Sequence, residues 1–256
     1  MEKRMDSSRM DHLRWVTYEQ RVKDPHTIVL LPVGAPEQHG PHLPLGTDAL
    51  LATAVAHSVT AQMGGIVAPP INYGYKSQPK CGGGQHYPGT INLDGSTLAS
   101  PTCDIIAELA RHGVRNIAVV SGHYENQWFL TEGIDLARRR VGYDSALHIM
   151  RLAYWDFLTK ATLAKTFPTG FPGFALEHAA VLETSMMLHI FPIWCIWTCY
   201  QTSHLPTSLP TTCIRPVRTG CLPPVRCRQP KARVQKKDCK WLTKSAKGMP
   251  TRCVTS

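Results

Sequence analysis

TIVLLPVGAPEQHG, residues 27–40, is the stretch that decides the fold. It begins with an apolar, largely β-branched run and ends in a loop that contains glycine and proline. Such a run is typical of a strand buried on both faces. The next segment, TDALLATAVAHSVTAQMG (47–64), has helical spacing and a terminal glycine, and either Thr47 or Asp48 is placed to cap it. The two segments together predict a strand that leads into a helix.

The same alternation continues through most of the chain. Further strands are predicted in GGIVAPP (64–70), NIAVV (116–120) and HIMRLAYWDFL (148–158), and further helices in STLASPTCDIIAELARHG (96–113), NQWFLTEGIDLARRRVG (126–142) and ALEHAAVLETSMMLHIFP (175–192). Strands that alternate with helices form a mainly parallel sheet with helices on both faces. We therefore predict a three-layer α/β/α fold, with polar loops gathered at the carboxyl ends of the strands.

Two short polar motifs follow predicted strands. Each pairs a carboxylate with an imidazole two residues apart: Glu37 with His39, and His123 with Glu125. Residues i and i+2 of an extended segment point the same way, and Asp48 follows at a helix start, where it can bridge. Either motif alone is common by chance. Three carboxylates and two histidines together are the ligand types of a two-metal hydrolytic site.

Longer segments resemble the creatininase family, the creatinine amidohydrolases, in family order over about residues 10–192. The segments that carry the resemblance are VLLPVGAPEQHGPHLPLGTDALLA, INYGYKSQPKCGGGQHYPGTINLDG, DIIAELARHG, VVSGHYENQWFLTEGIDLA, LAYWDFL and GFPGFALEHAAVLETSMML. The resemblance implies a zinc and/or manganese pair, reversible hydrolysis of the cyclic amide of creatinine to creatine, and a homohexamer.

The resemblance also implies roles for individual residues. Glu37, Asp48 and His123 resemble the ligands of one metal, and His39, Asp48 and Glu125 those of the other, with Asp48 shared. The residues that resemble substrate-contacting groups are Ser77, Tyr124, Trp155, Phe174 and His178, and His178 and Glu125 are the predicted catalytic residues. From residue type alone, the better interpretation by roughly two to one is that Trp155 is an aromatic residue of the core and His178 a histidine on a helix surface.

One position departs from the family pattern. Creatininases have a tryptophan on the substrate lid where GFPGF supplies Phe174. Phenylalanine keeps an apolar ring but has less area and no indole N–H. We expect weaker creatinine binding with the metal site intact, and an amide or formamide hydrolase acting on another small heterocycle is the alternative.

The composition changes abruptly after Pro192. Residues 191–256 hold 12 Lys and Arg and one acid, Asp238, whereas residues 1–190 hold 16 basic and 17 acidic residues. Seven of the nine cysteines also lie beyond residue 192. We therefore divide the chain into a creatininase-like domain, 1–192, and a basic, cysteine-rich tail, 193–256, predicted to be disordered. This tail is the one feature that favours a nucleic-acid or membrane-surface binder.

Reverse translation suggests another origin for the tail. With one added nucleotide before Ile193, the codons permit FPDLVHMDMLPDEPPANFPPYDVY, which resembles the continuation of a creatininase. The hypothesis is that residues 193–256 are an out-of-frame translation, and an intact frame for this tail in the transcript would contradict it. On this hypothesis the cysteines imply no disulfides and the charge no nucleic-acid partner, but the aberrant end could leave a pseudoenzyme that fails to assemble.

The remaining expectations concern location. The N-terminus has no apolar stretch like a signal peptide, and no window offers the ~18 apolar residues that a spanning helix needs. We expect a cytoplasmic enzyme that acts on a small molecule like creatinine, without a membrane partner.

Overall fold

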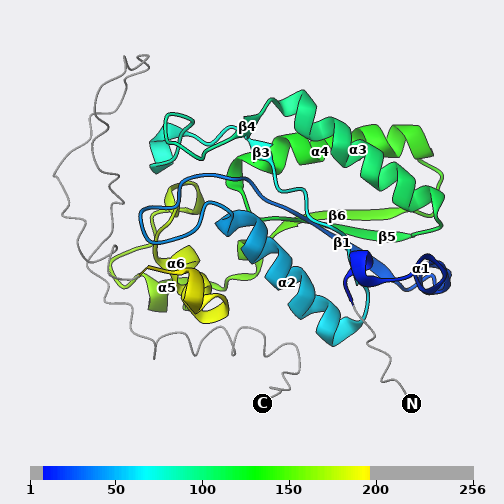
Figure 1. Cartoon of the computed structure of the whole chain (residues 1–256), viewed down its shortest axis with the longest axis horizontal. Coiled ribbons are helices and arrows are strands. Elements are labelled where there is room, and N and C mark those ends of the chain that lie inside the picture. Colours follow the sequence, from blue (N-terminus) through cyan, green and yellow to red (C-terminus); the bar gives the residue numbers. More distant parts are fainter. Residues whose placement is uncertain (1–7, 197–256) are drawn as a thin grey trace.

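The computed structural model describes residues 8–196. Its centre is a sheet of four parallel strands in the order β2-β1-β5-β6 (Figure 1), made of β1 (Ile28–Val33), β2 (Ile66–Val67), β5 (Asn116–Ser121) and β6 (His148–Ala153). The strands are in parallel register, with Val29 opposite both Ile66 and Ile117. The predicted parallel sheet is confirmed.

Alternate residues of the strands face different helices. Val29, Leu31 and Val33 pack with α3 (Gly95–Arg111) and α4 (Gln127–Val141) in the largest core cluster. Leu30 points the other way and packs against Ala52 and Ala56 of α2 (Thr47–Met63). Figure 1 shows the same division, with α3 and α4 on one side of the sheet and α2 on the other. The predicted three-layer arrangement is therefore confirmed.

Two glycines let the loops after β1 and β5 press against the start of α2. A Cβ on Gly34 would lie 2.3 Å from the backbone nitrogen of Ala49, and one on Gly122 would lie 2.2 Å from the carbonyl oxygen of Asp48. No other residue type fits at these distances. The close approach brings the first turn of α2 to the carboxyl ends of the two central strands.

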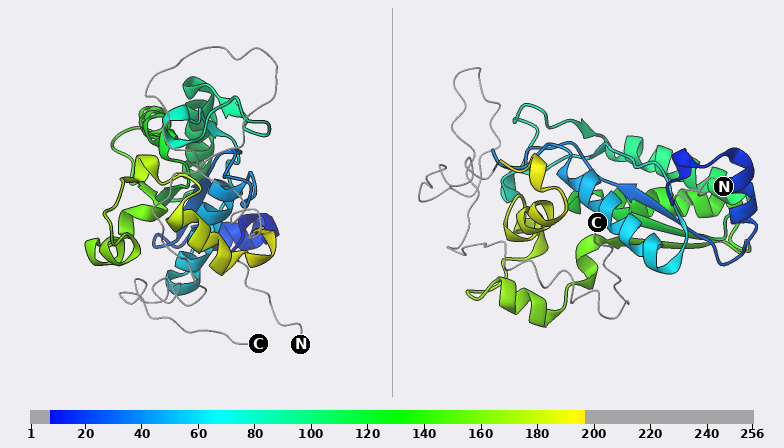
Figure 2. Two further views of the ribbon diagram at one scale, coloured as in Figure 1. Left: turned by 90° about the vertical axis from the view of Figure 1, so that its left-hand side faces the viewer. Right: turned by 60° about the horizontal axis from the view of Figure 1, so that its bottom comes forward.

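Several elements were not predicted. The structure adds α1 (Trp15–Val22), α5 (Lys160–Thr166) and a small parallel pair, β3 (Gly74–Tyr75) with β4 (Asn92–Leu93). Helices α5 and α6 (Val181–Ile190) lie at one end of the sheet and α1 at the other (Figures 1 and 2). The unpredicted elements α1, α5, β3 and β4 are too short for a periodicity to show in the sequence.

One predicted helix cap and one predicted helix start are wrong. Helix α2 has Gly46 as its N-cap, and no side chain caps it. The helix predicted from residue 175 begins only at Val181, because Phe174–Leu176 form a 3-10 turn and Ala179 has a φ of +50°. A positive φ on alanine is incompatible with a continuous helix.

The structure describes only the first four residues, 193–196, of the predicted tail. A 3-10 turn spans Pro192–Trp194, and the backbone nitrogen of Ile196 donates to the carbonyl oxygen of His42. The rest of the predicted tail, 197–256, lies outside the described residues, so the two-part division and the predicted disorder of the tail stay predictions. Among the helices of residues 8–196, none is long and apolar enough to cross a membrane.

Candidate metal centre and active site

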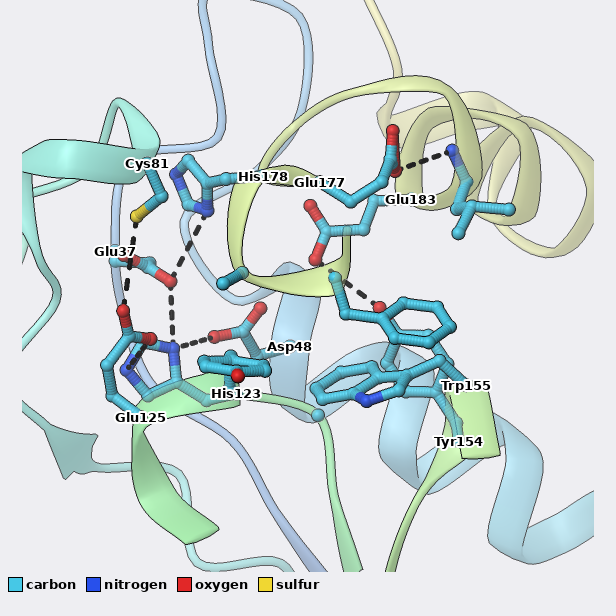
Figure 3. A pocket seen from close by; sticks show the side chains of 15 residues that line it. Glu37, Asp48, Cys81, His123, Glu125, Tyr154, Trp155, Glu177, His178 and Glu183 are labelled. Carbon is cyan, nitrogen blue, oxygen red and sulfur yellow. Dashed lines mark hydrogen bonds and ion pairs between the residues drawn. The ribbon is translucent and has the colours of Figure 1, made fainter. Parts of the chain in front are cut away.

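A cluster of buried carboxylates and imidazoles lies at the carboxyl ends of β1 and β5 (Figure 3). The loop after β1 carries Glu37 and His39, and the segment after β5 carries His123 and Glu125. Asp48 enters from the first turn of α2. The structure thus brings all five predicted metal ligands to one place, although they come from three separate segments.

Glu37, Asp48 and His123 form one group with the geometry of a metal site. His123 Nδ1 lies 2.9 Å from Glu37 Oε1 and 3.0 Å from Asp48 Oδ2, and all three side chains are buried. Glu37 Oε2 is buried without a hydrogen-bond partner. Burial of charged oxygens without partners costs several kcal/mol, which a divalent cation would offset. The group therefore fits a metal, and it is the first ligand set that the sequence predicted.

His39, Asp48 and Glu183 form a second group of the same kind. His39 Nε2 lies 2.9 Å from Asp48 Oδ1 and 3.6 Å from Glu183 Oε2. The other ring nitrogen, Nδ1, lies 3.1 Å from the carbonyl oxygen of Glu37, which orients the ring. The two oxygens of Asp48 face different groups, so this carboxylate can serve two metals.

Glu125 lies on the other side of His123. Its Oε2 is 3.5 Å from His123 Nε2, and its Oε1 is 4.0 Å from the Cys81 thiol. Glu125 lines the same pocket, but in the described structure the carboxylate grouped with His39 and Asp48 is Glu183. The assignment of Glu125 to the second metal stays a prediction.

Electrostatics within the cluster favour charge on His39, His123 and Glu37 but not on Glu125. Burial opposes charge on His39 and His123, but the surrounding carboxylates outweigh it and raise the pKa of both imidazoles well above the usual range. For Glu37, burial would raise the pKa, yet the neighbouring His123 lowers it well below the ordinary value. Burial, together with the nearby Glu37 carboxylate, raises the pKa of Glu125. In this geometry protons on the imidazoles stand where metal ions would bind.

His178 lies next to the first ligand group. Its Nε2 is 2.7 Å from the carbonyl oxygen of Gln38, and its Nδ1 is 3.6 Å from Glu37 Oε1. The side-chain amide nitrogen of Gln38 lies 3.1 Å from the same Nε2, so both Gln38 contacts hold this ring nitrogen, and Nδ1 is left facing Glu37 and the pocket. A histidine held in this way can accept or return a proton at Nδ1.

Aromatic rings form one wall of the pocket that the ligand cluster lines. Trp155 stacks on Tyr124 at 6.3 Å between ring centroids and on Phe174 at 6.1 Å. These three predicted substrate-binding residues line the pocket together with His178. Flat rings beside carboxylates suit a planar, positively charged group.

Ser77 is the predicted substrate residue that the structure places differently. Its side chain is buried, and its Oγ accepts a hydrogen bond from the backbone nitrogen of Gly84 at 2.8 Å. It is not among the residues that line the pocket. In the described structure Ser77 holds the glycine-rich loop, and its contact with a substrate stays a prediction.

Sequence reasoning missed four residues of the site, namely Cys81, Tyr154, Glu177 and Glu183, all of which line the pocket. Glu183 is the most important because it completes the second ligand group. A signal for it was available, since a carboxylate inside the apolar helix VLETSMMLHI is unusual unless it has a buried partner. The Tyr154 hydroxyl supplies one such partner, at 3.3 Å from Glu183 Oε1.

The fold and the cluster define a class: an α/β protein whose buried carboxylates and histidines, suited to hold metal ions, lie at the carboxyl edge of a parallel sheet. The sequence matches the creatininase family, described as creatinine amidohydrolase, over residues 11–210. The chain therefore belongs to the creatininase family of metal-dependent amidohydrolases.

Two relatives illustrate the range of the family. The creatinine amidohydrolase of Pseudomonas putida is 48% identical over 183 residues, which are 70% of each chain. The mycofactocin precursor peptide peptidase of Mycolicibacterium smegmatis is 35% identical over 176 residues, 64% of this chain and 58% of that protein. The family thus includes proteins named for different amide substrates.

Solved creatininase structures are similar as well. A manganese form is 44% identical with a TM-score of 0.76, and a glutamate-to-glutamine variant complexed with creatine is 43% identical with a TM-score of 0.76; each match covers 83% of both chains. A zinc–zinc form of such a variant is 39% identical with a TM-score of 0.83, over 93% of both chains. The structures of relatives therefore hold manganese or zinc.

Proposed function

We propose that this chain hydrolyses the cyclic amide of creatinine to creatine with two divalent cations, zinc and/or manganese. The observation that carries the proposal is the Asp48 carboxylate, whose two oxygens lie 2.9 Å from His39 Nε2 and 3.0 Å from His123 Nδ1. Such a bridging carboxylate is what a two-metal hydrolytic site requires. A relative at 48% identity named for creatinine and a similar structure complexed with creatine support the choice of substrate.

The ligands divide into two sets around Asp48. We assign Glu37, Asp48 and His123 to one cation, and Asp48 with His39 to the other. Glu125 and Glu183 are both candidates to complete the second set, the first by family resemblance and the second by its 3.6 Å approach to His39. When bound, the two cations would polarise the amide carbonyl and lower the pKa of a water molecule.

The other residues of the pocket would bind and orient the substrate and move a proton. Tyr124, Trp155 and Phe174 offer flat faces to the creatinine ring, and Ser77 would support the loop beside it. We assign to His178 the transfer of a proton, through Nδ1, to the ring nitrogen that leaves. We propose that Glu125 assists this transfer, because burial raises the pKa of its carboxyl group. Assembly as a homohexamer and a cytoplasmic location are further expectations from the family.

Metal analysis combined with a creatinine–creatine assay tests the proposal. We expect two metals per chain and turnover in both directions. Asp48→Asn should lower the hydrolytic activity by more than the roughly 10- to 100-fold expected when a residue that only orients a metal ligand is lost. It should also lower the metal content. Asp104→Asn is the matched control, because Asp104 is an exposed α3 carboxylate paired with Arg140.

Other results would favour the alternatives. Two metals per chain without creatinine turnover would indicate an amide or formamide hydrolase for another small heterocycle. Absence of metal together with aggregation would indicate a pseudoenzyme disabled by its C-terminal segment. Nucleic-acid binding that persists after deletion of residues 193–256 would support the remaining alternative, a binding protein.

A further inference from the structure

The aromatic wall of the pocket continues beyond the pocket itself. Trp128 lies edge-to-face with Tyr124 at 6.4 Å between ring centroids and 82° between ring planes. Tyr124 in turn stacks on Trp155, which stacks on Phe174. Trp128 does not line the pocket, and 60% of its surface is exposed. It therefore extends the wall outward, from the ligand cluster towards solvent.

The backbone that carries Trp128 is held firmly although its indole is exposed. Two residues earlier, the buried Asn126 side chain accepts from the backbone nitrogen of Tyr75 at 2.7 Å and donates to the carbonyl oxygen of Gly34 at 3.1 Å. One residue later, Phe129 packs on the Tyr75 ring at 4.1 Å, and Leu130 is fully buried. A large ring on a fixed backbone binds a ligand with little loss of conformational entropy.

We propose that Trp128 forms an outer binding position for a planar group on a substrate whose reacting amide occupies the inner pocket. The inference rests on the proposed function and extends its substrates beyond creatinine, to amides that carry an aryl or similar flat substituent besides the small ring or guanidine. Stacking on the indole face suits aromatic and cationic planar groups alike. Glu132, exposed one turn further along α4, adds a negative charge that favours the cationic ones.

Binding of two small probes tests the inference without any turnover. Guanidine fits the inner pocket alone, whereas benzylguanidine adds one flat ring that can reach outward. With the full-length, metal-loaded protein, we expect tighter binding of benzylguanidine than of guanidine. Trp128→Ala should reduce this preference by about 2- to 10-fold, the usual range for one aromatic contact. Trp128→Phe, which keeps a smaller ring, should retain part of it.

Trp15→Ala is the matched control. Trp15 is 76% exposed on α1, at the opposite end of the sheet from α5 and α6 (Figures 1 and 2), and its loss should leave the preference unchanged. An unchanged preference in both Trp128 variants would overturn the inference, as would an equal loss of affinity for both probes in Trp128→Ala. A wild-type protein that hydrolyses creatinine but does not prefer benzylguanidine refutes this inference alone. An aryl preference without creatinine turnover refutes only the proposed function.

Discussion

At the scale of single residues, the chemistry depends on a few side chains whose neighbours are small. Asp48 can face two ligand groups because Gly122 lets the segment after β5 approach within contact distance of its carbonyl oxygen. A methyl group at position 122 would push the α2 start away from His123, since its Cβ would lie 2.2 Å from that oxygen. Position 122 is therefore as constrained as the ligands themselves.

Phe174 carries a residue-scale prediction. The ring stacks on Trp155 at 6.1 Å and lies edge-on to Phe171 at 4.7 Å, so it forms part of the aromatic wall. Phe174→Trp adds ring area and an N–H donor, and should lower the KM for creatinine by about 2- to 10-fold. The metal content should not change, because Phe174 belongs to neither ligand group. Steady-state kinetics with an unchanged KM would contradict the prediction.

At the scale of elements, the start of α6 is held by side chains instead of an ordinary N-cap. The carboxylate of Glu177 accepts from the backbone nitrogens of Val181 and Leu182 at 2.8 and 3.0 Å. Burial, assisted by the neighbouring Glu183, raises the pKa of Glu177 to about 8. A carboxyl group that is protonated at neutral pH can bind these donors without an uncompensated buried charge. Glu177 thus positions the helix that carries Glu183.

The second prediction concerns this helix start. Glu177→Ala leaves two backbone N–H groups without acceptors, and should lower the free energy of unfolding by about 1–3 kcal/mol in urea titrations. Glu177→Gln keeps a neutral acceptor and should retain most of the stability. Glu108→Ala, which removes an exposed α3 carboxylate paired with Arg111, is the control and should cost well under 1 kcal/mol. Equal losses in the alanine and glutamine variants would show that the carbonyl acceptor is unimportant.

At the scale of the whole molecule, the ligand cluster ties together parts that the sheet alone does not join. Its members come from the loop after β1, the first turn of α2, the segment after β5, and α6. Metal ions bound there should stabilise the folded chain by binding it and not the unfolded chain. The stabilisation depends on pH because His39 and His123 must lose their protons to bind a metal.

The sign of this dependence follows from the raised pKa of both imidazoles. Without metal, the charged pair stabilises the fold fully below the unfolded-state pKa near 6.5, and this contribution is lost as the pH rises through the raised values. Zinc displaces those protons, so its stabilising effect should grow with pH. We expect the rise in Tm on zinc addition to be larger at pH 8 than at pH 6, as measured by calorimetry. An equal rise in Tm at both pH values would contradict the prediction.

A structural feature can be predicted from the sequence alone when the residues that determine it lie close together in the chain. The long strands and helices could be predicted because their apolar periodicities are local, and the pairs Glu37–His39 and His123–Glu125 because strand geometry sets residues i and i+2 on one side. The start of α6 at Val181 could not be predicted, because it follows from a positive φ at Ala179 and from contacts made by Glu177.

The sequence by itself thus determined the parallel α/β class, the family and five metal-ligand candidates. Only the tertiary structure decided that Glu183 meets His39 and Asp48, that Ser77 holds the glycine-rich loop, and that Trp128 extends the aromatic wall. The physical reason is that carboxylates, hydroxyls and rings acquire a role from what they contact. The contacts of Glu183 join segments far apart in the chain, and those of Ser77 and Trp128 depend on an irregular loop and turn, which no periodic pattern in the sequence records.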